Sequence, residues 1–195
     1  VIPLNISGTY NSVAYVTGTS HGSVQAVGST MYYTPFNNYS GPDSFTYTAT
    51  NAYGTSNVAT GNITVSPPPN QPPIARENTT VLFQNQTVSI DPRLATPEPP
   101  QAGDSDPDGD PLTITWVGQP AFAYGRVNGV DYNGSTGWPF SLGSFSTSGQ
   151  NISYTAPNLC SNYGCHLVIV FYYTISDGRG GTSTAPHVIV VYSQP

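Results

Sequence analysis

The sequence contains no lysine, and its four arginines stand against ten acidic residues, which gives a formal net charge of −6. Only 7% of the 195 residues are charged. A chain with so few cations has no basic patch to neutralise phosphates, so nucleic acid is excluded as a partner. The same deficit argues against binding to an anionic membrane surface.

Long apolar runs are also missing. The most apolar stretch, His166–Tyr173, has the length of a strand and falls far short of a membrane span, so membrane insertion is not expected. The three histidines, His21, His166 and His187, are dispersed, and none lies near a nucleophile motif. We therefore predict that the protein is not an enzyme.

The chain is instead rich in residues that break or flank strands: it has 20 glycines, 19 prolines and 14 tyrosines. Glycine and proline recur every several residues, and no helical periodicity lasts longer than a turn or two. Short runs of alternating apolar and polar residues lie between these breaks, as is typical of strands. The predicted fold class is all-β.

One hairpin pattern occurs twice, in residues 43–65 and 170–191. Phe45 and Tyr47 alternate with threonines in the first copy, and Tyr173 continues this alternation in the second. Each copy breaks at a turn rich in Gly, Asn or Asp, which supply positive φ. Because one supersecondary unit is used twice, we predict two β-sandwiches in tandem.

The segments upstream of the two hairpins also correspond. His21–Val24 aligns with Tyr124–Val127, and Tyr32–Pro35 aligns with residues 153–157. Between these aligned segments the second copy is longer than the first, so an insertion is predicted at residues 128–153.

A proline-rich stretch, Ser66–Pro73, separates the two copies. Prolines at this density favour an extended, semi-rigid spacer. The predicted domains are therefore residues 1–67 and residues 68–195.

Five motifs spread over both domains point to one family. They are YTP (33–35), YSGPDSFTY (39–47), PNQPPIA (69–75), DSDPDGDPLTI (104–114) and ISDGRGGTS (175–183). Together they resemble the bacterial Ig-like and cadherin-like repeats of large surface proteins such as adhesins and autotransporter-type stalks. The resemblance implies two Ig-like sandwiches in an extracellular or cell-surface protein, with neighbouring Ig-like domains or subunits as partners. It specifies a fold and a setting more closely than a function.

The first domain is short for this fold. It opens with the alternating residues Ile2, Leu4 and Ile6 and has about six expected strands, whereas an Ig-type sandwich has about seven. The leading strand of the second domain has no counterpart, so the first domain is predicted to be N-terminally incomplete. Either the chain is cut from a longer array, or a neighbouring subunit adds the strand, with residues 188–195 or an unseen tail as the expected donor.

An acidic loop occurs in the second domain. Asp104, Asp106 and Asp108 stand at every second position and Gly109 follows, as at positions 1, 3, 5 and 6 of an EF-hand calcium loop. The match stops there, because Thr115 stands where that loop has its twelfth-position Glu. Further ligands must come from elsewhere, and the candidates are Asp110, Glu77, Asp91 and Asp177.

Two interpretations of this loop stay open. Four carboxylates within seven residues repel one another, and the nearest arginine in sequence is Arg93, so a bound calcium ion would relieve the repulsion. Alternatively, Asp, Pro and Gly form a solvated acidic turn, since all three residue types favour turns. Calcium is the favoured interpretation.

Three aromatic residues, Tyr132, Trp138 and Phe140, lie among glycines and serines in the insertion. Such a loop can stack a sugar ring, which makes a host or matrix glycan a candidate partner. Alternatively, the rings fold back to cover a sheet edge, and we favour this interpretation.

The only two cysteines, Cys160 and Cys165, stand five positions apart. A metal site needs more ligands than the adjacent His166 supplies. A disulfide is therefore predicted, and it implies an oxidising, extracytoplasmic setting.

Three functional hypotheses follow. The favoured one is a rigid, calcium-stabilised tandem spacer in the stalk or adhesive part of a cell-surface protein. The second is a repeating subunit of an extracellular filament assembled by strand complementation. The third is a carbohydrate-binding accessory module of a secreted enzyme.

Overall fold

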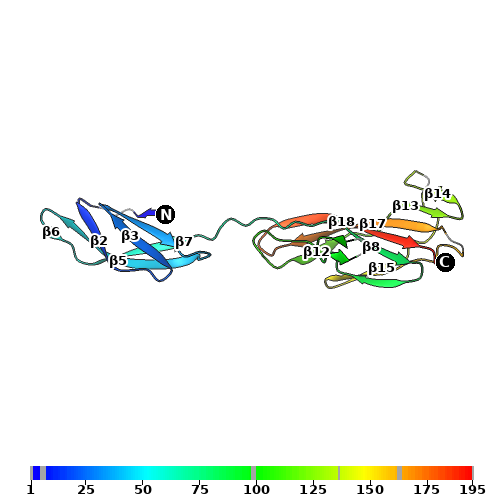
Figure 1. Cartoon of the computed structure of the whole chain (residues 1–195), viewed down its shortest axis with the longest axis horizontal. Helices are drawn as coiled ribbons and strands as arrows, with labels where there is room; N and C mark the ends of the chain where they lie inside the picture. Colours follow the sequence, from blue (N-terminus) through cyan, green and yellow to red (C-terminus); the bar gives the residue numbers. More distant parts are fainter. Residues whose placement is uncertain (1, 5–7, 98–99, 136, 162–163, 195) are drawn as a thin grey trace. The chain divides into compact units, whose positions relative to one another are not determined.

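A computed structural model describes residues 2–4, 8–97, 100–135, 137–161 and 164–194. These residues form strands and no helix, which confirms the all-β prediction (Figure 1). Within the described ranges there is accordingly no helix that could cross a membrane. The chain divides into two compact units, residues 1–69 and 70–195, which are described separately.

Unit 1 is a sandwich of two antiparallel sheets. The first sheet has the order β1-β4-β3, formed by Ile2–Leu4, Thr30–Pro35 and Gly22–Val27. In the second, the long strand β5 (Gly41–Asn51) pairs with β2 (Ser12–Thr17), β7 (Ala59–Val65) and the short β6 (Gly54–Thr55). Ile6, which was also expected in the first strand, lies outside the described residues.

A small core lies between these two sheets. Its buried apolar members are Val13, Met31, Tyr33, Phe45 and Ile63. They come from alternate positions of β2, β4, β5 and β7, as the period of two in a strand requires. The outward positions of β2 and β7 are exposed, whereas those of β4 and β5 are mostly half-buried.

Unit 2 is a larger sandwich. One sheet has the order β14-β13-β17-β18-β8, with β12 also paired to β17, and the other has the order β15-β16-β9. The strands of the first sheet are β8 (Asn78–Phe83), β12 (Thr113–Val117), β13 (Ala121–Val127), β14 (Val130–Tyr132), β17 (His166–Ser176) and β18 (Thr182–Tyr192). Those of the second are β9 (Thr87–Ile90), β15 (Ser144–Ser148) and β16 (Asn151–Thr155). The short strands β10 (Thr96–Pro97) and β11 (Pro100–Gln101) pair with each other in antiparallel orientation.

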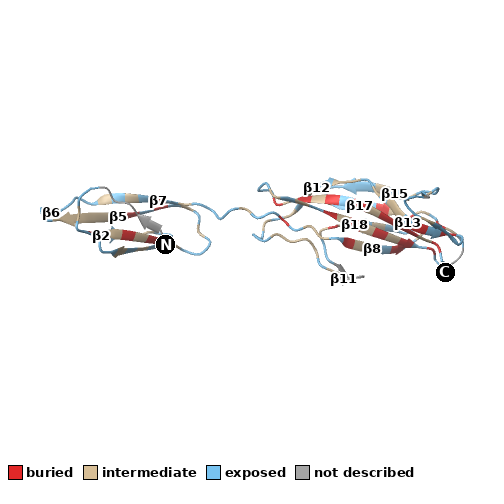
Figure 2. Cartoon of the chain, turned by 90° about the horizontal axis from the view of Figure 1, so that it is seen from above, coloured by how far each residue is buried: buried red, intermediate tan, exposed pale blue. Residues whose placement is uncertain are grey.

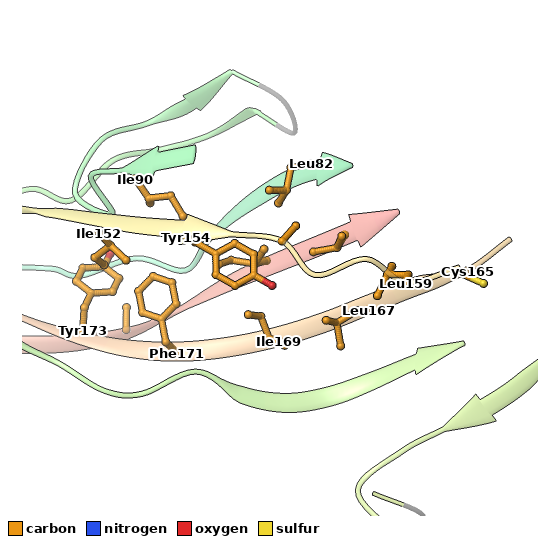
Figure 3. Close-up of a cluster of buried hydrophobic side chains, with 14 of the residues drawn as sticks. Leu82, Ile90, Ile152, Tyr154, Leu159, Cys165, Leu167, Ile169, Phe171 and Tyr173 are labelled. Atoms are coloured by element: carbon orange, nitrogen blue, oxygen red, sulfur yellow. The ribbon is translucent and has the colours of Figure 1, made fainter. Parts of the chain in front are cut away.

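The core of unit 2 is built around β17 and β18, where buried residues alternate with less buried ones (Figure 2). Tyr154 of β16 and Leu82 of β8 reach the same cluster as Phe171 and Ile169 of β17 (Figure 3). Tyr173 lies in this cluster and is fully buried. This is the core that positions the loops of the candidate site.

The repeated hairpin is present in both units. In unit 1 β5 pairs with β7, with Phe45 opposite Gly61, and in unit 2 β17 pairs with β18, with Phe171 opposite His187. Both turns contain glycine at positive φ, as the sequence predicts: Gly54 has a φ of 137° and Gly178 a φ of 74°. The hairpin prediction is confirmed in both copies.

The upstream alignment is wrong in one part. Tyr33 and Tyr154 occupy corresponding places, but Val24 lies on β3, which pairs with β4, whereas Val127 lies on β13, which pairs with β17. The true counterpart of β3 is β15, because β15 pairs with β16. The extra segment therefore lies between β12 and β15, at residues 118–143, instead of at residues 128–153.

A shared packing requirement explains this misalignment. Gly22 of β3 lies directly against the Tyr33 ring, and Gly125 of β13 lies directly against the Trp138 ring. A Cβ atom at either position would collide with an aromatic ring, so both strands need glycine. The two segments look alike because each accommodates a ring on its surface, and not because they are equivalent strands.

Strand β8 runs parallel to β18, with His187–Tyr192 in register with Asn78–Phe83. Strand β18 is thus paired on both edges, by β17 and by β8. The expectation that residues 188–195 could donate a strand to another molecule is therefore wrong for Val188–Tyr192, because donation would dismantle the sheet of unit 2.

Candidate functional site

The acidic loop precedes β12 and brings three carboxylates together. One oxygen from each of Asp106, Asp108 and Asp110 lies within 4.8 Å of the other two. Alternate carboxylates converge in this way because the backbone turns sharply at Gly109, which has a φ of 80°. Carboxylate oxygens at such spacing are suited to a hard divalent cation.

Hydrogen bonds hold the loop in this shape. The Oδ1 atom of Asp106 accepts bonds from the amides of Asp108, at 2.8 Å, and Asp110, at 3.1 Å. The Gly109 amide donates to the Asp106 carbonyl. The loop thus folds around the Asp106 side chain, whose other oxygen, Oδ2, is buried and makes no hydrogen bond among the described residues.

The start of unit 2 is attached to this loop. The amide of Gln71 donates to Asp108 Oδ2 at 2.7 Å, and its side-chain nitrogen donates to Asp108 Oδ1 at 3.1 Å. These two hydrogen bonds lower the pKa of Asp108, and the bond from the Gln71 amide contributes more than the bond from the Gln71 side chain. The Asp108 carboxyl is therefore held in its charged form.

A second acidic group lies on the turn between β17 and β18. Asp177 accepts bonds from the amides of Arg179 and Gly181, and Asn70 donates to its Oδ2 atom at 2.6 Å. The Oδ1 atom of Asn70 is buried and has no partner among the described residues.

The structure does not gather all five predicted ligands. Asp104 and Glu77 lie outside the group formed by Asp106, Asp108 and Asp110. Asp104 instead accepts bonds from the Arg76 amide, at 2.8 Å, and the Tyr173 hydroxyl, at 3.0 Å. Burial raises the pKa of Asp104, although these two hydrogen bonds oppose the increase.

Of the two other carboxylates considered as ligands, Asp91 is committed elsewhere. Its oxygens lie 2.9 Å and 2.7 Å from the Arg93 guanidinium. The Arg93 side chain also donates to the Leu112 carbonyl. Asp91 therefore fixes the loop that follows β9.

Two arginines that are distant from the acidic loop in sequence lie beside it in the fold. Arg179 of the β17–β18 turn forms an ion pair of 3.0 Å with Asp110, and Arg76 donates to Gly103 and Ser105. Sequence proximity suggested Arg93 as the nearest cation. Arg179 offsets part of the acidic charge, which leaves Asp106 and Asp108 without an ion pair in the described part of the chain.

The aromatic residues of the extra segment form a cluster on β13 and β14. Trp138 stacks on Phe122, with ring centroids 5.0 Å apart, and packs edge-to-face against Tyr132 and Phe140. Its indole nitrogen donates to the Ser141 carbonyl at 3.2 Å. The rings thus cover the sheet and one another, although Phe140 is 47% exposed.

Cys160 and Cys165 form a disulfide, with Cα atoms 6.3 Å apart. Gln84 holds the same loop, since its oxygen accepts the Leu159 amide and its nitrogen donates to the Cys160 carbonyl. Ser193 accepts a bond from the Cys165 amide, which ties the loop to the end of β18. The predicted disulfide is present.

Two buried titratable groups, Asp43 and His187, have surroundings that the sequence did not indicate. Asp43 in unit 1 is 8% exposed and accepts bonds from Tyr33, Ser20, His21 and Ser44. His187 in unit 2 is 1% exposed. Only the alternation of residues around them offered a signal, because Asp43 and His187 both fall on the inward face of their strands.

Comparisons with known proteins agree with this architecture. A family model of the bacterial Ig domain matches residues 3–65 and, a second time, residues 70–190. The chain therefore belongs to the bacterial Ig domain family, as the repeated motifs predict. Domains of this family are typically found in surface or secreted proteins.

Similarity to solved structures is distant. The endo-fucoidan hydrolase MfFcnA4 of glycoside hydrolase family 107 is 15% identical with a TM-score of 0.32, over 96% of this chain and 24% of that one. The titin domains Z1Z2, in complex with telethonin, are 13% identical with a TM-score of 0.35, over 95% of this chain and 91% of that one. The chain thus spans about a quarter of the hydrolase. No match was found among curated proteins.

Proposed function

We propose that the chain is an extracellular, non-catalytic structural module, a tandem Ig-like spacer of a cell-surface or secreted protein, whose second unit is stabilised by calcium. The convergence of Asp106, Asp108 and Asp110 carries this proposal. Family membership and the disulfide support the extracellular setting.

Calcium suits this loop better than a transition metal does. The candidate ligands are carboxylate oxygens, with no Cys or His in the group. Hard cations prefer such oxygens, and calcium accepts irregular arrangements of carboxylates, whereas the smaller magnesium ion needs near-octahedral geometry. The unpartnered Oδ2 atom of Asp106 provides a ligand that no protein donor occupies in the described structure.

Calcium would stabilise the module by cancelling repulsion within the loop. The Asp108 side chain holds Gln71 and Arg179 holds Asp110, so a rigid loop also fixes the first residues of unit 2 and the β17–β18 turn. A spacer benefits from such a link because the beginning of the unit is then less free to fray.

The test has two parts: a calcium titration of the full chain monitored by calorimetry, and thermal unfolding of the chain with and without calcium. We expect a Kd of about 10⁻⁴ to 10⁻³ M, as in other extracellular modules. At a calcium concentration of about 100 times Kd, unit 2 should gain about 2.7 kcal/mol of unfolding free energy. The double variant Asp106→Asn and Asp108→Asn should lose both effects.

Asp131→Asn is the matched control, because Asp131 is an exposed carboxylate of unit 2 that pairs with Arg126. This variant should bind calcium as the unchanged chain does. A chain whose unfolding is the same in calcium and in chelator would establish the alternative, a solvated acidic turn.

The second candidate function is a filament subunit assembled by strand complementation. The observation that favours it is the edge of β7, which has β5 as its one partner among the described strands. The third candidate, a carbohydrate-binding accessory module, depends on the cluster of Tyr132, Trp138 and Phe140. Because these rings pack mainly on one another, the spacer is the better-supported function.

A further inference from the structure

The two units differ at one sheet edge. In unit 2 the last strand, β18, is flanked by the parallel strand β8. Its counterpart in unit 1 is β7, because Phe45 opposite Gly61 corresponds to Phe171 opposite His187. Among the described strands of unit 1, none lies beside β7 on the side away from β5.

Burial at equivalent positions follows this difference. Tyr173, Ile175 and Val191 of unit 2 are all fully buried. Their counterparts in unit 1 are Tyr47, Ala49 and Val65, which pack against the core but are only partly buried. The inner surface of unit 1 is therefore less covered at the places that correspond to the best-buried positions of unit 2.

The Tyr173 hydroxyl shows how unit 2 closes this region. Its oxygen lies 2.8 Å from the Arg76 carbonyl, 3.1 Å from the Pro92 carbonyl and 3.0 Å from Asp104 Oδ1, and its single proton is shared among these three acceptors. The hydroxyl so anchors the segment that leads into β8. The equivalent residue in unit 1 is Tyr47, and the described part of that unit holds no segment in the corresponding position.

The edge itself is suited to pairing. Strand β7 contains neither a charged residue nor a proline, and these are the features by which exposed edges commonly avoid further strands. An unpaired edge presents a row of backbone N–H and C=O groups, which is the template for strand addition.

We propose that the β7 edge of unit 1 accepts a parallel β-strand from a segment outside residues 1–195, with the residue pattern of β8. In β8 the inward positions Asn78 and Leu82 are buried, while Val81 and Phe83 are exposed. The occupant is thus an uncharged extended segment with a polar residue and a large aliphatic residue facing inward, four positions apart. The inference rests on the β7 edge and on the pattern of β8, and not on the calcium site.

The internal repeat specifies how to test this. In unit 2, β8 continues through a turn at Asn85, which has a φ of 64°, into β9, where Val88 pairs with Tyr154. In unit 1, Ile2 pairs with Tyr33, the counterpart of Tyr154. Ile2 therefore corresponds to Val88, and residue 1 corresponds to Thr87. A copy of residues 78–86 joined directly ahead of residue 1 thus continues the same register.

The experiment compares three full chains by hydrogen exchange at the β7 amides: the unextended chain, the chain extended by this copy, and the same extension with Leu82→Asp in the copy. We expect the unaltered extension to slow exchange in residues 61–65 by about tenfold or more. The aspartate extension should leave exchange near the unextended value. The β18 amides serve as an internal control for the folding of unit 2.

Two outcomes would overturn the proposal. Equal exchange in the two extended chains would show that the edge does not select the β8 pattern. The other outcome concerns the unextended chain. If its β7 amides exchange more slowly as the protein concentration rises, and sedimentation shows dimers, the occupant is a second copy of the chain instead.

Discussion

The hydroxyl of Tyr33 lies 2.8 Å from the Asp43 carboxylate, and both side chains are buried in unit 1. The pKa of Tyr33 is raised to about 12, mainly because the hydroxyl is buried and secondly because it donates a hydrogen bond to Asp43. Burial alone would raise the pKa of Asp43, but the bonds from Tyr33 and from the amides of Ser44, Ser20 and His21 together lower it below 3.8. The charged carboxylate is therefore part of the folded unit.

Unit 1 should lose stability in acid for this reason. Because the pKa of Asp43 is lower in the folded state, its contribution is fully present above the ordinary value of 3.8 and is lost as the pH falls through the folded pKa. Tyr33→Phe should lower the unfolding free energy of unit 1 by about 2 kcal/mol at pH 7. Tyr53→Phe, at a tyrosine that is 99% exposed, is the control and should have no effect in the same denaturation measurement.

Unit 2 should lose stability over a higher pH range because of His187. Its ring stacks on Phe171, its Nε2 atom lies 2.9 Å from the Thr80 hydroxyl, and burial lowers its pKa from 6.5 to about 4. The unfolded chain therefore takes up a proton first as the pH falls below 6.5, and by pH 4 the loss should reach about 3 kcal/mol. His187→Gln should flatten this dependence in denaturation curves at pH 7 and pH 4.5, and His166→Gln, at a less buried position, should leave it intact. If the unfolding free energy of unit 2 falls by the same amount between pH 7 and pH 4.5 in the unchanged chain and in His187→Gln, the pH dependence does not come from His187.

The disulfide should contribute to unit 2 alone. Closing the loop between Cys160 and Cys165 should stabilise the folded state by about 2 kcal/mol, since the ring is short. The double variant Cys160→Ser and Cys165→Ser should show this loss in the unfolding of unit 2. Unit 1 contains no cysteine, so its transition serves as the control. Free thiols in freshly secreted protein would argue against an oxidising setting.

Truncation of the aromatic cluster separates a structural role from glycan binding. Trp138→Ala should destabilise unit 2 by about 2–3 kcal/mol, because the indole covers Phe122 and Gly125. Phe140→Ala should cost less than Trp138→Ala, since that ring is half exposed. If a glycan array shows binding that Phe140→Ala abolishes without loss of stability, the ligand-loop interpretation of Tyr132, Trp138 and Phe140 is the correct one.

Local patterns were sufficient to predict the repeated hairpin. Alternation around Phe45 and Tyr173, with glycine in each turn, depends on residues near one another in sequence. The disulfide was predictable for the same reason, since Cys160 and Cys165 had no other partner. The pairing of β18 with β8 was not, because more than a hundred positions separate the strands.

The candidate cation site shows the same limit. Spacing alone indicated that Asp106 and Asp108 converge, and the loop backbone achieves this. Spacing could not show that Asp104 accepts a hydrogen bond from Tyr173, or that Arg179 forms an ion pair with Asp110. Those contacts are between residues far apart in sequence, and only the arrangement of strands brings them together.

The parallel pairing of β8 and β18 has a mechanical consequence. Tension applied to unit 2 pulls β8 at Asn78 and β18 at Tyr192, which lie at opposite ends of the paired strands. The hydrogen bonds cross between the strands, so this load shears the whole set at once instead of opening them one after another. Unit 2 can therefore carry force between its first and last strands through the same pairing that seals its core.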